Sequence, residues 1–418
     1  MGRYRLRCIS CGSRCSGRSL CCHNDNGLLR AEYERKQLTL SEHRGIWKFL
    51  EWLPVNDVLE GPYGGSITYL SESLADEIGI EQLYISFNGY WPERNADLIT
   101  CSFKDLEAPP TIEMLRELGG NEVLVVSSAG NTARAFTHVS AMVGYPLALV
   151  VPCSSMKRLW LPDQGLDTSS IFVVEVEGDY CDAIALGERL SLMPGFAPEG
   201  GARNVARRDG MGTVMLEGAL QIGQLPRHYF QAVGSGTGGI SAWEASLRLI
   251  GDGRFGDVLP RLHLVQNLPC APIYSAANHT SYDERCPNGM VDDVLFNRKP
   301  PYSIPGGVAD AVRATNGDII GMTTKEAYDA KNLFERVEGI DIMPAAATAV
   351  AALMKAISEE TVPKGESILL NVTGGGTERI AKEMELTQLR SDLRVGKESD
   401  IIEIAKAAKE ALKEVGRR

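Results

Sequence analysis

The sequence has no long apolar run, which argues against a membrane-spanning helix. Crossing a bilayer takes about 20 consecutive, mostly apolar residues, and no stretch of this chain approaches that length. The basic segment from Met1 to Arg7 is not followed by an apolar segment, so we expect no signal peptide. We therefore expect a cytoplasmic protein without a membrane partner.

The chain also lacks an excess of positive charge. Its 54 Asp and Glu residues outnumber its 43 Lys and Arg residues, which gives a net charge of −11 and a pI near 5.2. A surface of this sign repels a phosphate backbone, so we expect no nucleic-acid partner. If the substrates are anions, local basic groups have to overcome the negative field of the whole protein.

What the chain does have is an alternation of short apolar strands and amphipathic helices. Its 418 residues suffice for two or three domains. Val123–Val126 and Tyr229–Val233 predict strands, whereas Thr132–Val143 and Asp182–Leu192 predict helices. This alternation is typical of crossover units in parallel sheets, so we predict an α/β fold.

Ten cysteines are distributed unevenly along the chain. Five lie between Cys8 and Cys22 in a polar, basic segment, and the others are scattered singly. Scattered cysteines in a large acidic protein are typical of buried thiols and not of disulfides. The N-terminal group therefore needs an explanation of its own.

The clearest local motif is a glycine-rich loop between a predicted strand and a predicted helix. It reads Gly234-Ser235-Gly236-Thr237-Gly238-Gly239. Glycines let backbone N–H groups turn toward an anion, and the helix dipole attracts a phosphate. The run fits G-x-G-x-x-G, but a dinucleotide site expects an acidic residue after the next strand, where Gln266 and Asn267 stand. We interpret the loop as a cradle for one phosphate; a tight turn without a ligand is the alternative.

Two further loops follow predicted strands. Ser127-Ser128-Ala129-Gly130-Asn131-Thr132 offers hydroxyls and N–H groups that suit a carboxylate, and Asn131 can hydrogen-bond a phenolic oxygen. Thr373-Gly374-Gly375-Gly376 places a hydroxyl that could reach a ring nitrogen. Ligands of open α/β sheets bind beyond the carboxyl ends of strands, so these loops are candidate sites. A helix N-cap and a plain glycine turn are the structural alternatives.

One lysine stands out by its position. Lys104, in Ser102-Phe103-Lys104-Asp105, opens a predicted helix. The positive end of the helix dipole favours the neutral amine there, which is the form that condenses with a carbonyl. Taken alone, one lysine among 43 basic residues indicates nothing specific.

In combination, these motifs resemble the fold-type II pyridoxal 5′-phosphate (PLP) enzymes, the class of tryptophan synthase β. The resemblance covers about residues 61–379 and is strongest to threonine synthase and its relatives. It implies two α/β domains with the cofactor between them, and Lys104 as the Schiff-base lysine and the base at the substrate Cα. Asn131 would contact the cofactor 3′-oxygen, and Thr373 its pyridine nitrogen. The cofactor phosphate would lie on Gly234, Ser235, Gly236, Thr237 and Gly238.

A basic segment extends the resemblance. Residues 204–213 are similar to the threonine synthase stretch N-P-x-R-x-E-G-x-x-T, whose arginine meets the substrate phosphate and corresponds to Arg207. A cluster of guanidinium groups also suits phosphate or sulfonate, although a solvated basic turn is the alternative. The predicted substrate-binding residues are Ser127, Ser128, Gly130, Thr132, Arg134, Arg203 and Arg207.

Several segments depart from threonine synthase. The stretch before Lys104 is longer, with residues 88–95 in place of N-P-T-G, and Arg134 stands where small residues are usual. These features and residues 200–213 and 229–242 are similar to the cysteate synthases. Those are threonine synthase relatives of methanogenic archaea that serve coenzyme M biosynthesis. The resemblance implies a PLP-dependent transferase that replaces the phosphate of O-phospho-L-serine by sulfite, giving L-cysteate and phosphate.

Other functions stay open on the sequence. Threonine synthase and O-phosphoserine sulfhydrylase are the enzyme alternatives. The departures before Lys104 and the extra Arg134 weigh against threonine synthase, and the arginines count against the sulfhydrylase, because sulfide needs no added cation. A catalytically silent PLP-fold binding protein is disfavoured by the intact Lys104, Asn131 and glycine-rich loop. Gln266 disfavours a nicotinamide oxidoreductase.

The N-terminal segment is similar to the zinc ribbon of threonine synthase relatives, C-x-x-C … C-x-x-C-G-G-L-L. Cys8-x-x-Cys11 is intact, but the second pair reads Cys22-x-x-Asp25. Structural zinc prefers four Cys or His ligands, so we expect a degenerate ribbon without metal. Zinc on Cys8, Cys11 and Cys22, completed by Cys15, Cys21 or His23, is the alternative.

The resemblance also predicts the division of the chain. We expect a Cys-rich segment in residues 1–45, a large PLP-binding domain in 46–98 and 196–418, and a small substrate-side domain in 99–195. The expected partners are the small anions O-phosphoserine and sulfite, together with further copies of this chain in a homo-oligomer.

Overall fold

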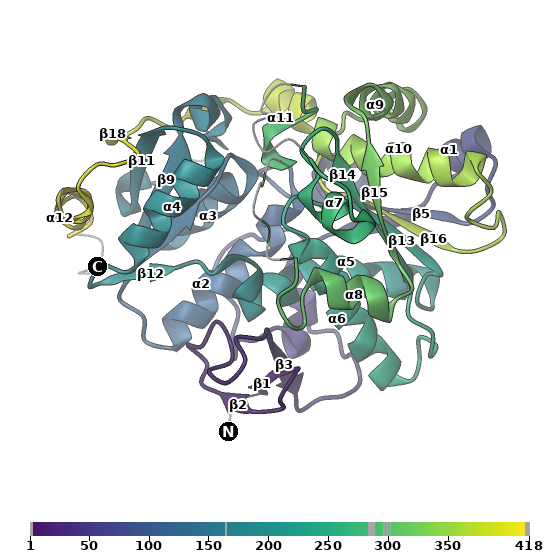
Figure 1. The fold of residues 1–418 in the computed structure, drawn as a ribbon, viewed down its shortest axis with the longest axis horizontal. Coiled ribbons are helices and arrows are strands. Elements are labelled where there is room, and N and C mark those ends of the chain that lie inside the picture. Colours follow the sequence, from purple (N-terminus) through teal and green to yellow (C-terminus); the bar gives the residue numbers. More distant parts are fainter. Residues whose placement is uncertain are drawn as a thin grey trace.

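The computed structural model describes residues 3–163, 165–282, 289–295, 297, 300 and 302–413. The larger of its two main sheets occupies one half of the molecule (Figure 1). Five of its six strands are parallel, and only the edge strand β4 runs antiparallel to its neighbour. The strands in spatial order are β15 (Asp318–Met322), β14 (Arg261–Asn267), β13 (His228–Ala232), β16 (Ile368–Val372), β5 (Leu83–Phe87) and β4 (Ile67–Leu70).

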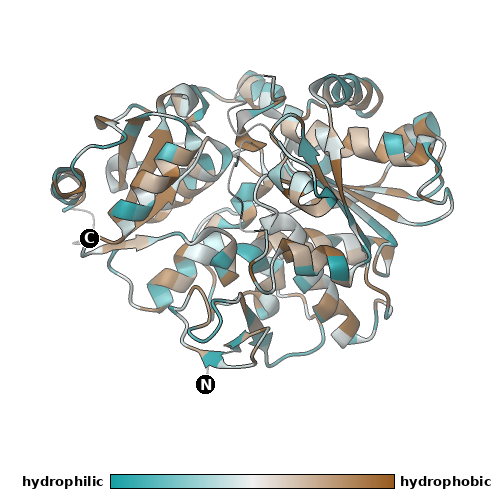
Figure 2. Cartoon of the chain, viewed as in Figure 1, coloured by the Kyte–Doolittle hydropathy of each residue, from teal (hydrophilic) through white to brown (hydrophobic). Residues whose placement is uncertain are grey.

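Helices cover both faces of this sheet, as a parallel sheet requires. The apolar side chains of α9 (Thr324–Glu338) and α10 (Pro344–Ser358) pack on one face together with Phe230 and Val265. The opposite face, which includes Tyr229 and Leu264, packs against Ile273 of α7 (Pro272–Asn278) and against three further helices. These are α5 (Val205–Ile222), α6 (Thr237–Asp252) and α8 (Val308–Ala314). Alternate residues of each strand therefore enter different cores, and the strands are among the most hydrophobic parts of the chain (Figure 2).

The smaller sheet has five parallel strands and lies in the other half of the molecule (Figure 1). Its order is β12 (Phe196–Pro198), β8 (Val123–Ser127), β9 (Leu147–Pro152), β11 (Ile171–Glu177) and β18 (Leu393–Gly396). One face packs against α2 (Ala108–Glu117) and α3 (Asn131–Val143). The other face packs against α4 (Tyr180–Ser191) and the C-terminal helix α12 (Ile401–Ala411).

The N-terminal segment forms a small antiparallel sheet at the base of the molecule (Figure 1). Its strands are β2 (Arg14–Cys15), β1 (Tyr4–Cys8) and β3 (Leu29–Tyr33). The fully buried Arg208 of α5 ties this sheet to the rest, because its guanidinium donates to the Leu29 carbonyl and pairs with Glu244 of α6 over 3.0 Å.

Shorter elements complete the frame. The helices are α1 (Glu72–Ile78), α7 (Pro272–Asn278) and α11 (Thr377–Glu383). Two antiparallel pairs are β6 (Tyr90–Trp91) with β7 (Ala96–Asp97), and β10 (Trp160–Pro162) with β17 (Leu386–Gln388). The short 3₁₀ segments are η1 (Gly45–Trp52), η2 (Pro92–Arg94), η3 (Phe103–Leu106), η4 (Cys153–Arg158), η5 (Thr168–Ser170), η6 (Gly201–Arg203) and η7 (Asp293–Leu295).

The observed fold confirms the predicted α/β class, with two parallel-rich sheets and a ribbon-like N-terminus. The predicted domain boundaries put all of residues 196–418 in the large domain, and two segments of this range lie elsewhere in the structure. The strands β12 and β18 instead hydrogen-bond to β8 and β11 of the smaller sheet, and α12 packs on α4. Among the described helices, none is long and apolar enough to cross a membrane.

Candidate active site

One cavity collects residues from the three ligand loops, from the segment around Lys104 and from the basic segment that contains Arg207. It opens where β8, β13 and β16 end, so it lies at the carboxyl ends of parallel strands from both sheets. The predicted residues that line it are Lys104, Ser128, Gly130, Asn131, Thr132, Arg207, Gly234, Ser235, Gly236, Thr237, Gly238 and Thr373.

Lys104 is positioned by a link to the end of β16. The backbone N–H of Phe103 donates to the Thr373 carbonyl over 3.1 Å, and Ser102 forms a β-bridge with Gly374. This link carries η3, and with it Lys104, to the loop that contains Thr373. Two motifs that are 269 positions apart in the chain therefore share one wall of the cavity.

The amine of Lys104 lies in a partly buried and polar setting. Its Nζ is 3.3 Å from Oε2 of Glu107, one helical turn further on, and 4.6 Å from the centre of the Phe103 ring. Burial lowers the pKa of Lys104; Glu107 acts against this, whereas the nearby Arg207 acts with it. The net lowering favours the neutral amine, the nucleophilic and basic form.

The glycine-rich loop lies between β13 and α6. Helix α6 is capped by Gly236, which has a φ of +82° and no side chain to accept from the first-turn N–H groups. An added Cβ at Gly236 would collide with Val308, and one at Gly238 with the amide of Gln231. The loop can therefore be built only from small residues, and it presents the positive end of a 16-residue helix to the cavity.

The loop of residues 127–132, here called the serine-rich loop, is held in shape by one of its own side chains. The hydroxyl oxygen of Ser128 accepts from the backbone N–H groups of Gly130 and Ala133, each over 3.1 Å. Gly130 has a φ of +153°, which L side chains rarely adopt. The loop thereby directs Asn131 and Thr132, the first residues of α3, into the cavity.

Arg207 lies in the cavity wall between two carboxylates. Its Nε is 2.8 Å from Glu107, and its Nη1 donates to Glu199 over 2.6 Å. Burial alone lowers the pKa of this guanidinium, but the two carboxylates outweigh burial and raise it. Because Glu107 also faces Lys104, a single carboxylate connects the two cations of the site.

A buried polar network lies beneath the strand ends. Asn371 of β16 accepts from Asn88 over 2.9 Å and donates to the hydroxyl of Tyr229 over 2.8 Å. That hydroxyl donates to Gln231, whose side chain lines the cavity. These hydrogen bonds link the ends of β16 and β13 to each other and help to hold them in one arrangement.

Three predicted substrate-binding residues lie outside the cavity lining. The hydroxyl of Ser127 points toward Gly187 of α4. Arg134 is buried behind the serine-rich loop and donates to Asn131. Arg203 donates to Asn26 of the N-terminal segment over 2.7 Å. The structure therefore brings Ser128, Gly130, Thr132 and Arg207 together without these three.

Three residues that line the cavity or contact its basic groups were not predicted from the sequence: Glu107, Tyr180 and Glu199. Glu107 could have been found, because it lies three residues after Lys104 on a helix. Tyr180 reaches the cavity from α4, and Glu199 reaches Arg207 from the segment after β12. Nothing in their local sequence marks these two residues, because only the packing of the two sheets brings them to the site.

The described cavity fits a PLP molecule. A partly buried lysine, a helix N-terminus without a side-chain cap and a threonine line one space. These groups match the aldehyde, phosphate and ring nitrogen of the cofactor in turn. A family model described as "Pyridoxal-phosphate dependent enzyme" matches residues 70–374.

Solved structures support the fold. Maize serine racemase superposes with a TM-score of 0.56 at 15% identity, covering 76% of this chain and 91% of that one. A PLP-dependent aspartate racemase superposes with a TM-score of 0.57 at 17% identity, covering 75% and 90%. At these identities the likeness concerns the fold alone.

Curated relatives narrow the family. A cysteate synthase from Methanococcoides burtonii is 54% identical over 393 residues, 94% of each chain. Another, from Methanosarcina acetivorans, is 50% identical over 406 residues, 94% of this chain and 97% of that one. The matches therefore extend well beyond the cofactor-binding part. This chain belongs to the pyridoxal-phosphate dependent enzymes and, within them, to the cysteate synthase family.

Proposed function

We propose that the chain replaces the phosphate of O-phospho-L-serine by sulfite and releases L-cysteate and inorganic phosphate. The observation that carries the proposal is the convergence of Lys104, the glycine-rich loop and Arg207 on one cavity, in a member of the cysteate synthase family. A replacement of one anionic group by another needs a base, a cofactor cradle and a cation, and this cavity offers all three.

The cofactor-binding residues follow from the lining of the cavity. Lys104 would hold the aldehyde carbon, the N–H groups of residues 234–238 the phosphate, Asn131 the 3′-oxygen and Thr373 the ring nitrogen. PLP, when bound, supplies an electron sink for negative charge that develops at the substrate Cα.

Lys104 would move the Cα proton. Its lowered pKa increases the neutral share of the amine, and the neutral amine is the form that acts as a general base. Glu107, 3.3 Å away, stabilises the ammonium that forms when the amine accepts the proton. Lys104 is thus both the attachment point of the cofactor and the proton carrier.

Arg207 would hold the anionic group at Cβ. The C–O bond to phosphate breaks with its electron pair leaving on phosphate, and the sulfur lone pair of sulfite then forms the new C–S bond. Both groups are anions of similar size, so one buried guanidinium can serve them in turn. Ser128, Gly130 and Thr132 line the same cavity and would bind the substrate carboxylate.

Supplying different substrates to one enzyme preparation tests this proposal. The holoenzyme is incubated with O-phosphoserine and either sulfite, sulfide or no added nucleophile, and separately with phosphohomoserine. We expect L-cysteate with sulfite as the main product. Cysteine as the preferred product would indicate an O-phosphoserine sulfhydrylase, and threonine from phosphohomoserine a threonine synthase. Cofactor binding without turnover of any substrate would indicate a silent binding protein.

A homo-oligomer and a cytoplasmic location remain part of this proposal. Both are expectations from the sequence, and neither depends on the geometry of the cavity. Light scattering of the purified holoenzyme would measure the oligomeric state directly, and a monomeric mass would contradict the first of the two.

A further inference from the structure

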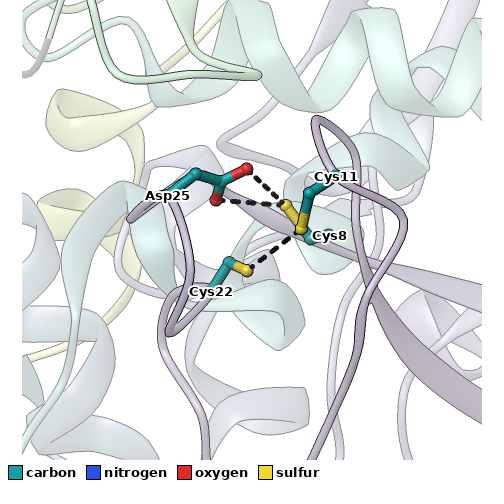
Figure 3. Close-up of side chains that lie close together, drawn as sticks. All are labelled: Cys8, Cys11, Cys22 and Asp25. Carbon is teal, nitrogen blue, oxygen red and sulfur yellow. Dashed lines mark hydrogen bonds between the residues drawn. The ribbon is translucent and has the colours of Figure 1, made fainter.

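Four potential metal ligands cluster in the N-terminal segment. The sulfur atoms of Cys8, Cys11 and Cys22 and a carboxylate oxygen of Asp25 all lie within 4.8 Å of one another (Figure 3). Cys8 and Cys22 are buried, Asp25 is partly buried and Cys11 is exposed. The three cysteines are free thiols and not members of a disulfide.

Two turns of the same design supply these ligands. In the first, the Cys8 N–H donates to the Ser13 carbonyl, and the Gly12 N–H donates to the Cys8 carbonyl over 3.0 Å. In the second, the Cys22 N–H donates to the Gly27 carbonyl, and the Asn26 N–H donates to the Cys22 carbonyl, also over 3.0 Å.

The match between the turns extends to the backbone angles. The fifth residue of each turn is left-handed, with a φ of +73° at Gly12 and +57° at Asn26. Glycine and asparagine are the residues that adopt this region most readily. In this alignment Asp25 occupies the place in the second turn that Cys11 occupies in the first. The pair of turns therefore presents four side chains in equivalent positions, although only three of them are cysteines.

We propose that Cys8, Cys11, Cys22 and Asp25 bind one zinc ion. Three thiolates favour a soft, tetrahedral metal over Mg²⁺ or Ca²⁺, and carboxylate oxygen is an accepted zinc ligand. Binding forms three Zn–S bonds and one Zn–O bond, and the thiol protons pass to solvent.

The distances fit a tetrahedral ion. With Zn–S and Zn–O bonds of about 2.3 and 2.0 Å, a tetrahedron separates two sulfurs by about 3.8 Å and a sulfur from an oxygen by about 3.5 Å. The Cys11 and Cys22 sulfurs are 3.5 Å apart, and the Cys8 sulfur is 3.3 Å from Oδ1 of Asp25. Small outward shifts of these side chains would admit the ion.

Neighbouring groups hold the ligands in place. The backbone N–H of Asn24 donates to the Cys22 sulfur over 3.4 Å, and its side chain lies 3.8 Å from the Cys11 sulfur. The N–H of Gly27 donates to Asp25 over 2.9 Å. Hydrogen bonds of this kind orient metal ligands in proteins.

The ion would fasten the N-terminal segment to the helix that carries Arg207. Val205, at the start of α5, packs directly in the apolar cluster that contains Cys8 and Cys22. Arg203, two residues earlier, donates to Asn26 of the second turn. A closed metal site would therefore stabilise the docking of both turns against the N-terminus of α5. This role is structural and independent of the reaction proposed above.

Metal analysis of the full-length holoenzyme tests the proposal without relying on activity. The protein is purified under reducing conditions, exposed to Zn²⁺, dialysed and analysed by mass spectrometry of the elements. We expect about one zinc per chain, as in other structural sites. Cys11→Ala and Asp25→Ala should lose most of this zinc, whereas Cys15→Ala and Cys21→Ala, which change cysteines outside the cluster, should keep it.

A variant that changes one ligand but keeps four separates the loss of a ligand from misfolding of the segment. Asp25→Cys should keep the zinc, and after replacement by Co²⁺ its thiolate-to-metal charge-transfer band should be about one third stronger than in the parent, because four thiolates replace three. Two outcomes would overturn the proposal: a reduced parent that retains no zinc, or equal zinc retention in the Cys11→Ala, Asp25→Ala and Cys15→Ala proteins.

Discussion

Arg134 donates a hydrogen bond to the side-chain oxygen of Asn131 over 2.7 Å, from one turn further along α3. The same guanidinium donates to the carbonyls of Thr100 and Arg158 and lies 4.5 Å from the centre of the Trp160 ring. These contacts fix the Asn131 amide with its oxygen toward Arg134, while its nitrogen donates to the Met343 sulfur over 3.6 Å. Arg134 therefore acts on the site through Asn131, as a positioning residue.

Arg134→Ala should weaken PLP binding because the Asn131 amide is then free to rotate. Combining it with Asn131→Ala in a double-mutant cycle on the PLP dissociation constant should give a coupling energy of roughly 0.5–3 kcal/mol. The ratio of pyruvate to cysteate formed from O-phosphoserine should stay that of the parent. Unchanged PLP affinity with a raised ratio would instead place Arg134 on sulfite, in keeping with the substrate-binding role predicted for it from the sequence.

Glu107→Gln should shift the pH dependence of cofactor uptake to lower pH. The neutral amine of Lys104 is the reacting form, so uptake by the cofactor-free protein rises with pH through the pKa of Lys104. Burial lowers that pKa and the Glu107 carboxylate raises it, so removing the carboxylate lowers it further. Stopped-flow absorbance measures the uptake rate at each pH.

Two controls accompany this measurement. Glu93→Gln changes a surface carboxylate that pairs with Arg379 and should leave the midpoint in place. Lys104→Ala should show no borohydride-trappable cofactor and almost no turnover. A midpoint that moves to higher pH in Glu107→Gln would contradict the electrostatic role given to Glu107, and PLP trapped on another lysine would contradict the site.

Gly236→Ala should lose PLP much more readily than Gly253→Ala. Both glycines cap α6, one at each end, and both have a φ of +82°, so an alanine costs about 1–2 kcal/mol of backbone strain at either position. An added Cβ meets Val308 at Gly236 but open space at Gly253. PLP occupancy after dialysis and the free energy of unfolding separate the two effects. Full occupancy in Gly236→Ala would show that the loop does not cradle the cofactor phosphate.

Arg207→Ala should lower kcat/KM for O-phosphoserine roughly ten- to a hundredfold. The variant loses a charge-assisted hydrogen bond to the substrate phosphate, and such a bond contributes about 1.5–3 kcal/mol. Arg203→Ala is the matched control, because Arg203 lies outside the cavity lining and donates to Asn26. Steady-state kinetics with saturating sulfite compare the two. An equal loss of kcat/KM in both variants would contradict the assignment of Arg207 to the substrate phosphate.

The α/β class and the three ligand loops could be predicted from the sequence because each depends on local pattern. Buried parallel strands read as short apolar runs, and the residues that follow them meet at one edge of the sheets. Lys104, Asn131 and Thr373 were placed in one site on this ground together with the family resemblance, and the structure puts all three in the cavity lining.

The roles of the arginines and the domain boundaries required the structure. Arg134 and Arg203 look like additional anion-binding cations in the sequence, whereas the direction of each side chain is decided by the partner that it meets. The strand β18 pairs with β11 more than 200 residues earlier, and a parallel pairing at this separation leaves no local signal. The spacing already put Asp25 at the place of the fourth ribbon ligand, but only the structure shows that its carboxylate lies within 4.8 Å of the three cysteine sulfurs.

The central claim is that phosphate departure and sulfite addition occur in one cavity on one substrate molecule. Its most direct measurement is the stoichiometry of the reaction catalysed by the purified holoenzyme with O-phosphoserine and sulfite. We predict one L-cysteate formed for each phosphate released, with almost no pyruvate, and loss of both products in Lys104→Ala. Phosphate release without cysteate, or threonine formed from phosphohomoserine by the same protein, would contradict the account.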